Sequence, residues 1–110
     1  MRQLDVYKRG ILAGRLTEES PKRYVFRYND DYFSDSSKES VSLTLPKSQQ
    51  VYESEYLFPF FTNLLPEGDN KQTVCTWFHL DENDYFGLLM FYAGKDIIGN
   101  VTVELVKNED

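Results

Sequence analysis

The spacing of apolar residues changes along this chain from a period of two to a helical period and back, and this order constrains the fold. In the first 45 residues apolar side chains alternate with polar ones, as in strands that bury one face. Between residues 58 and 93 they recur at helical spacing. Alternation then returns at Val101, Val103 and Leu105. Strands followed by helices and a last strand indicate an α+β domain.

The first strands are predicted to form a hairpin. Residues 4–7 and 12–16 each alternate, and Arg9-Gly10 offers a tight turn between them. The third run places three aromatic rings on one face, which predicts packing on that face: Tyr24, Phe26 and Tyr28.

A fourth strand is predicted after the polar loop 34–40. Val41, Leu43 and Leu45 alternate there with hydroxyl-bearing residues. Pro46 cannot donate to a strand ladder and would close this strand.

Three helices are predicted in the middle of the chain. The first begins near Pro59, which is tolerated at a helix start, and ends before Pro66, with Phe58, Phe61 and Leu65 on one face. The second presents an amphipathic stripe of Val74, Trp77 and Phe78, a pattern more typical of core than of an interface. The third is apolar around most of its circumference from Tyr85 to Tyr92, so we expect it to be largely buried, with Asp81 as its cap and Gly94 as its stop.

These elements predict a mainly antiparallel sheet with about three short helices packed on one face. Such an arrangement covers only one side of the sheet. With 110 residues, of which 41% are hydrophobic and 15% aromatic, the chain has the size and composition of a single domain over 1–110 with its core at about 4–106.

The charge narrows the classes of partner. A formal net charge of -6 opposes direct binding to nucleic acid or anionic membranes, because these reward clustered Lys and Arg. The apolar runs are shorter than the ~20 residues of a membrane span, and the N-terminal residues lack a signal-peptide core. One cysteine cannot form an intramolecular disulfide. We therefore expect a cytoplasmic protein.

The residue types that carry catalysis are sparse. His79 is the only histidine and lies beside aromatic residues, where a partly buried or helix-end role is more common than that of a base. Cys75 has no obvious activating neighbour, which favours packing. Carboxylates cluster at 18–19, 30–31 and 81–84, as solvated surfaces and helix caps often do. No phosphate-binding loop or kinase catalytic motif occurs in the sequence, so we expect no enzyme, no cofactor and no metal site.

Four short segments occur in a recognisable order: Ser42-Leu43-Thr44-Leu45-Pro46, Asn63-Leu64-Leu65-Pro66-Glu67-Gly68, Asp84-Tyr85-Phe86-Gly87-Leu88-Leu89 and Ile98-Gly99-Asn100-Val101-Thr102-Val103. Together they make the chain resemble the N-terminal subdomain of the HipA family of serine/threonine kinase toxins. In that family the subdomain precedes the catalytic core and belongs to its regulatory contacts. In some operons it is encoded separately, alongside a shortened kinase and a helix-turn-helix protein.

The resemblance implies a noncatalytic, antitoxin-like subunit that binds and modulates a HipA-type kinase core in a bacterial toxin-antitoxin system. A helix-turn-helix DNA-binding protein in the same complex is the further partner it implies. One rival is an adaptor for an unrelated protein, which would lack a HipA-type kinase core in the adjacent reading frame. Another is a small acidic enzyme, which would bind a divalent metal or a nucleotide.

The predicted partner-binding residues centre on the second motif, where a stiff turn between helices would project side chains. The alternative is that Leu64 and Leu65 are core and the following turn only connects helices. Many family members carry a bulky apolar residue directly after this motif, whereas Asp69 stands here, which argues against a large side chain plugging the kinase site at this position. The predicted contacts are Asn63, Leu65, Pro66, Glu67, Gly68, Asp69 and Trp77.

Overall fold

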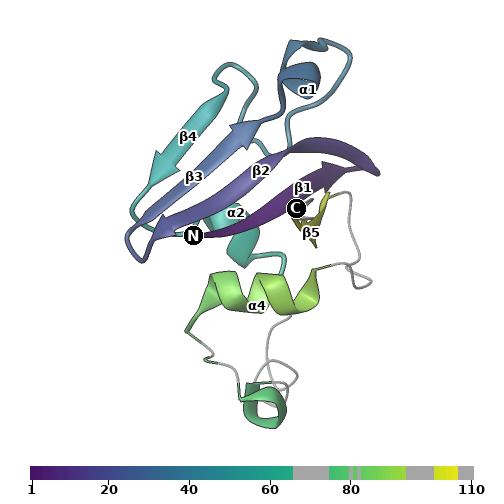
Figure 1. Cartoon of the computed structure of the whole chain (residues 1–110). Helices are drawn as coiled ribbons and strands as arrows, with labels where there is room; N and C mark the ends of the chain where they lie inside the picture. Colours follow the sequence, from purple (N-terminus) through teal and green to yellow (C-terminus); the bar gives the residue numbers. More distant parts are fainter. Residues whose placement is uncertain (66–74, 80, 82, 94–100, 107–110) are drawn as a thin grey trace.

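Five strands form a single antiparallel sheet in the order β4-β3-β2-β1-β5 (Figure 1). The computed structural model describes residues 1–65, 75–79, 81, 83–93 and 101–106. The strands are β1 (Arg2–Lys8), β2 (Ile11–Ser20), β3 (Arg23–Tyr28), β4 (Val51–Ser54) and β5 (Val101–Leu105).

The first two strands form the predicted hairpin. Arg9 and Gly10 connect them with φ angles of 52° and 80°. A two-residue turn with both φ values positive matches the right-handed twist of the strands that it joins. The predicted hairpin is therefore confirmed, and its turn falls where the sequence placed it.

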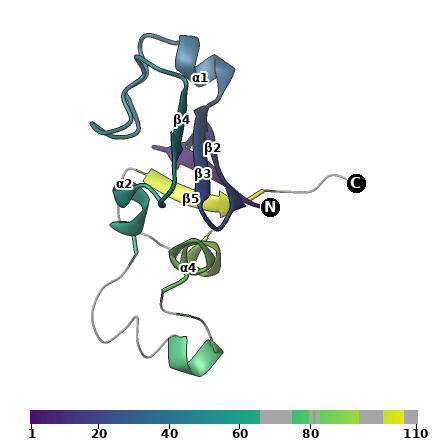
Figure 2. The ribbon, with the colours of Figure 1, turned by 90° about the vertical axis from the view of Figure 1, so that its left-hand side faces the viewer.

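The helices are α1 (Asp30–Ser34), α2 (Pro59–Thr62) and α4 (Tyr85–Tyr92), and residues 75–78 form one more helical turn. Figure 2 shows α2 and α4 together beside the sheet, while α1 lies beyond the end of β3. Ring contacts join the two layers: Phe26 lies 5.7 Å from Phe61 of α2, and Tyr24 lies 6.4 Å from Phe86 of α4, both between ring centroids. The predicted α+β class with a mainly antiparallel sheet is confirmed.

The core lies on one face of the sheet. Leu4, Leu16 and Phe26 stand side by side on neighbouring strands and are fully buried. The opposite face carries charged side chains such as Asp5 and Arg15, which pair at 3.1 Å. Among the described residues, the sheet is thus covered on one side only, as the order of strands and helices predicted.

The predicted strand at residues 41–45 is wrong. Val41 and Leu45 are buried, but Leu43 is 99% exposed, and the segment makes only one isolated bridge, between Ser42 and Leu45. The Ser42 hydroxyl accepts a hydrogen bond from the Thr44 amide at 3.2 Å, which closes a local turn in place of a ladder.

The strand beside β3 is instead β4, whose four residues sequence reasoning did not single out. The five-residue helix α1 was not predicted either. Both elements are too short for a periodic pattern to reveal.

The predicted cap of the third helix needs correction. Asp84, not Asp81, caps α4: its Oδ1 accepts a hydrogen bond from the Gly87 amide at 3.1 Å, while the Asp81 carboxylate accepts from Asn83 two residues on. The predicted stop at Gly94 lies outside the described residues. Helix α4 itself is confirmed.

Burial in the core, which the amphipathic stripe favoured, is wrong for the two members of the stripe that the structure describes. Trp77 and Phe78 are 74% and 57% exposed, whereas Cys75 in the same turn is buried. The third member of the stripe, Val74, lies outside the described residues.

A first prediction follows from the buried hydroxyl of Tyr28, which donates to the Leu45 carbonyl and accepts from the Val41 amide at 2.9 Å. Tyr28→Phe should lower the free energy of unfolding by about 1–3 kcal/mol, because it leaves a buried amide and a buried carbonyl unsatisfied. Urea unfolding followed by circular dichroism measures the change. The control is Tyr56→Phe, at a ring 77% exposed, which should shift stability little; equal effects of the two substitutions would contradict this role of Tyr28.

Candidate functional site

The predicted partner-binding segment begins at the end of α2. Asn63 is the C-terminal cap of this helix and is exposed, and its amide donates to the Pro59 carbonyl at 3.0 Å. Leu65 is only 7% exposed and belongs to the core. Its burial favours the structural alternative for this leucine, while Asn63 has the exposure that a contact requires.

Four of the predicted contacts, Pro66, Glu67, Gly68 and Asp69, lie outside the described residues. Their assignment to a partner surface therefore stays a prediction from the sequence. The buried Leu65 anchors the chain immediately before them.

An exposed aromatic pair lies on the short helical turn of residues 75–78. Trp77 is 74% exposed, and the Phe78 ring packs 5.0 Å from the ring of Phe91. Cys75 faces the core, so the turn is held with its aromatic side outward. Exposed aromatic side chains of this kind are common anchors of protein interfaces.

Cys75 and His79, the two residues considered for catalysis, lie at either end of the 75–78 helical turn. Cys75 is a buried free thiol. His79 is exposed and has a φ of 56°, at the end of the 75–78 turn. Among the described residues, no group of three or more His, Cys, Asp or Glu side chains has the geometry to hold a metal ion.

Arg2 joins three elements through a charged cluster that sequence reasoning missed. Its guanidinium donates to Glu18 of β2 with two contacts of 2.7 Å and to Asp84 at the start of α4 with two of 2.9 Å. The guanidinium also lies 5.2 Å from the centroid of the Phe86 ring. Arg2 and Asp84 are 82 positions apart, so no local pattern connects them.

Gly87 makes room for this cluster. A β-carbon at this position would lie 2.4 Å from Oδ2 of Asp84 and 3.2 Å from Nη1 of Arg2. The motif that starts at Asp84 therefore has a structural role. Asp84 caps α4, Gly87 leaves room for the side chains of Asp84 and Arg2, and Phe86 and Leu89 are buried. Hydrogen bonding from Arg2, and further from the Gly87 amide, holds the pKa of Asp84 below its usual value.

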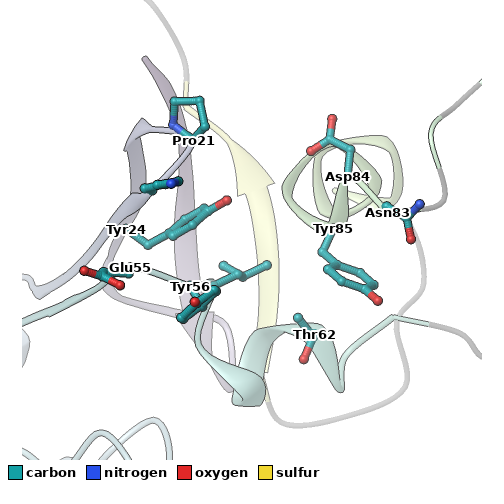
Figure 3. Close-up of a pocket in the computed structure, with 10 residues that line it drawn as sticks. Pro21, Tyr24, Glu55, Tyr56, Thr62, Asn83, Asp84 and Tyr85 are labelled. Carbon is teal, nitrogen blue, oxygen red and sulfur yellow. The ribbon is translucent and has the colours of Figure 1, made fainter.

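A pocket of about 470 Å³ opens beside this cluster (Figure 3). Tyr24 and Tyr56 lie on one side of it and Tyr85 on the other. Its size falls within the range of sites for small ligands and side chains. The pocket is lined by Pro21, Lys22, Tyr24, Glu55, Tyr56, Leu57, Thr62, Asn83, Asp84 and Tyr85.

The pocket brings together side chains from three parts of the chain. They come from the β2–β3 turn and the start of β3, from the segment between β4 and α2 with the end of α2, and from the start of α4. None of them was predicted as a site residue. Only the packing of α4 against the sheet makes them neighbours.

The chain is thus a small α+β domain with an exposed aromatic turn at 75–78 and a tyrosine-lined pocket beside α4. A family model described as the HipA N-terminal domain matches residues 4–104. A solved structure described as the N-terminal domain of HipA toxin aligns with a TM-score of 0.73 and 26% identity, covering 99% of this chain and 96% of that chain. The chain belongs to the HipA N-terminal domain family.

Relatives show two contexts for this domain. A protein of Haemophilus influenzae without an assigned function is 32% identical over 99 residues, which covers 90% of this chain and 88% of that protein. Two Sinorhizobium fredii proteins, putative kinases Y4dM and Y4mE, are 29% and 26% identical over 97% and 90% of this chain, but the matches cover only 27% and 23% of their lengths. The chain thus spans about a quarter of these kinases and most of the Haemophilus protein.

Among the described residues, no helix has the length and apolar composition to cross a membrane.

A second prediction concerns the ion pair of Asp84 and its pH dependence. Asp84→Asn keeps a capping side chain but removes the charge, so near neutral pH it should lower the free energy of unfolding by about 1 kcal/mol. Because the folded pKa of Asp84 is lowered, its ionic contribution is present above the unfolded pKa of about 3.9 and is lost as pH falls through the folded pKa. The free energies of unfolding of wild type and Asp84→Asn should therefore converge at acid pH, as measured by urea unfolding at several pH values.

The control is Asp81→Asn, away from Arg2. A constant difference between wild type and Asp84→Asn at every pH would contradict the prediction.

Proposed function

We propose that this chain is a noncatalytic, antitoxin-like regulatory subunit that binds a HipA-type serine/threonine kinase core and modulates its activity in the cytosol. The proposal rests on one observation: among its relatives, the domain occurs both as most of a small protein and as one part of longer putative kinases. The same domain forms nearly all of a Haemophilus protein and about a quarter of two putative kinases.

Where this domain packs on a kinase core within one chain, it would need a surface complementary to that core. Supplied on a separate chain, the same surface would bind the kinase core in trans. The binding would then depend on concentration and would make the kinase subject to regulation by the amount of its partner.

Two exposed sites support a kinase contact, the end of α2 and the 75–78 turn, and Figures 1 and 2 show them on either side of α4. The Asn63 side chain is exposed at the first site, and Trp77 has a largely exposed ring at the second. We assign Pro66, Glu67, Gly68 and Asp69 to the first site on their motif alone. Leu65 would support this first site from beneath, because its side chain is buried in the core.

We further propose that association with DNA requires a helix-turn-helix partner in the complex. The net charge of -6 opposes direct binding of this chain to phosphate backbones. The proposed complex therefore contains the kinase, this chain and a DNA-binding protein.

A third prediction tests the aromatic contact. Trp77→Ala should weaken binding to a HipA-type kinase core that lacks its own N-terminal domain by about tenfold or more, since exposed aromatic anchors often carry 1–2 kcal/mol or more of binding energy. Isothermal titration calorimetry measures the affinity, and circular dichroism checks folding. Leu43→Ala is the matched control, an exposed apolar residue on a distant turn. If both variants bind as the wild type does, Trp77 is not a contact.

A fourth prediction concerns the turn after Leu65. Glu67→Lys should weaken kinase binding without unfolding the domain, because it reverses charge at a predicted surface position. Leu65→Asp is the contrasting variant and should unfold the domain, since it places a charge in the core. Unchanged kinase affinity for a series of surface substitutions from 67 to 71 would make the segment a connector.

A fifth prediction tests the noncatalytic assignment. The isolated chain should neither bind ATP nor transfer phosphate, because its sequence lacks the motifs that cradle phosphates and hold magnesium. Saturable ATP binding with autophosphorylation, followed with radiolabelled ATP, would contradict it.

A further inference from the structure

The pocket beside α4 has a composition suited to a particular kind of ligand. Three tyrosine rings border it, and two of them are accessible: Tyr56 is 77% and Tyr85 41% exposed. Tyrosine faces carry a negative quadrupole potential that attracts cations. The rings come from different elements, so they border the pocket from opposite sides (Figure 3).

The charged cluster behind the rings is not balanced. One guanidinium, that of Arg2, is shared by the two carboxylates of Glu18 and Asp84, which leaves one excess negative charge. Asp84 is one of the residues that line the pocket and its side chain is 38% exposed, so part of this carboxylate is in contact with solvent beside the pocket. The other charged lining residues among those described, Lys22 and Glu55, offset each other in charge.

The cluster also fixes one wall of the pocket. The Tyr24 hydroxyl donates to Glu18 Oε2 at 3.2 Å, and burial raises the pKa of this tyrosine, with the charge of Glu18 adding to the shift. Tyr24 therefore stays neutral with its ring held in place. Accessible aromatic faces next to an accessible excess of negative charge favour a flat, weakly hydrated cation over an ammonium ion.

We infer that this pocket binds an arginine side chain presented by an extended segment of a partner protein. The guanidinium would stack on the tyrosine rings and direct its N–H groups toward the edge of the Asp84 carboxylate. The segment would pass between the β2–β3 turn and the start of α4, which border the pocket together with the segment between β4 and α2. This inference does not depend on the partner being a kinase.

The test uses the full chain, labelled with ¹⁵N, and two blocked tripeptides, acetyl-Gly-Arg-Gly-amide and acetyl-Gly-citrulline-Gly-amide. Citrulline has nearly the same shape as arginine but no charge. The arginine peptide should shift the amide resonances of Tyr24, Tyr56 and Asn83 with a Kd of about 1–10 mM, weakening as salt rises. The citrulline peptide should bind at least about fivefold more weakly.

Two variants complete the design. Tyr56→Ala removes an exposed ring and should weaken binding of the arginine peptide by about fivefold. Trp77→Ala is the matched control, because Trp77 is equally exposed but does not line the pocket, and it should leave the Kd unchanged.

The inference is overturned by any of three results. They are equal binding of both peptides, shifts that map away from the pocket, and no shifts at the highest soluble peptide concentration. Loss of kinase binding in Trp77→Ala with normal binding of the arginine peptide would separate the two surfaces, and would support both assignments.

Discussion

Burial of one face of a five-stranded sheet is the constraint on which the rest of this structure depends. The buried face carries aromatic and aliphatic side chains from neighbouring strands, among them Leu4, Leu16 and Phe26. An antiparallel sheet with one apolar face needs a second layer, and α2 and α4 provide it through Phe61 and Phe86. The polar face stays in solvent with its charges largely paired across strands.

The second layer is positioned by a small number of polar groups. Arg2 fastens the start of α4 to the first two strands through Glu18 and Asp84, and Gly87 allows the close approach. A similar role belongs to Tyr28, whose hydroxyl fixes the 41–45 turn against the sheet. Both sets of contacts use partly or fully buried hydrogen bonds, which fix geometry more strongly than apolar contact alone.

The tyrosine-lined pocket and the exposed turn with Trp77 both depend on the packing of α4. Because α4 packs across the sheet, its start borders the tyrosine-lined pocket, while its later residue Phe91 contacts Phe78 of the 75–78 turn. The pocket and the exposed Trp77 are therefore separate surfaces supported by one helix. Two separate surfaces would let the domain contact the proposed kinase partner and a further segment at the same time.

Sequence periodicity and turn residues were enough to predict the class of the fold, the β1–β2 hairpin, the aromatic face of β3, and the existence of α2, α4 and β5. These features depend on local periodicity and on turn residues such as Gly10, whose effects act within a few positions. The order of the four motifs also indicated the family.

The remaining features of the fold and of the candidate sites depend on tertiary contacts. Residues 41–45 alternate like a strand, yet their backbone turns on itself and hydrogen-bonds to Tyr28, and β4 takes the place beside β3. The exposure of Trp77, the Arg2 cluster and the pocket likewise arise where distant segments meet, because a side chain's burial and charge partners depend on contacts that spacing along the chain does not encode.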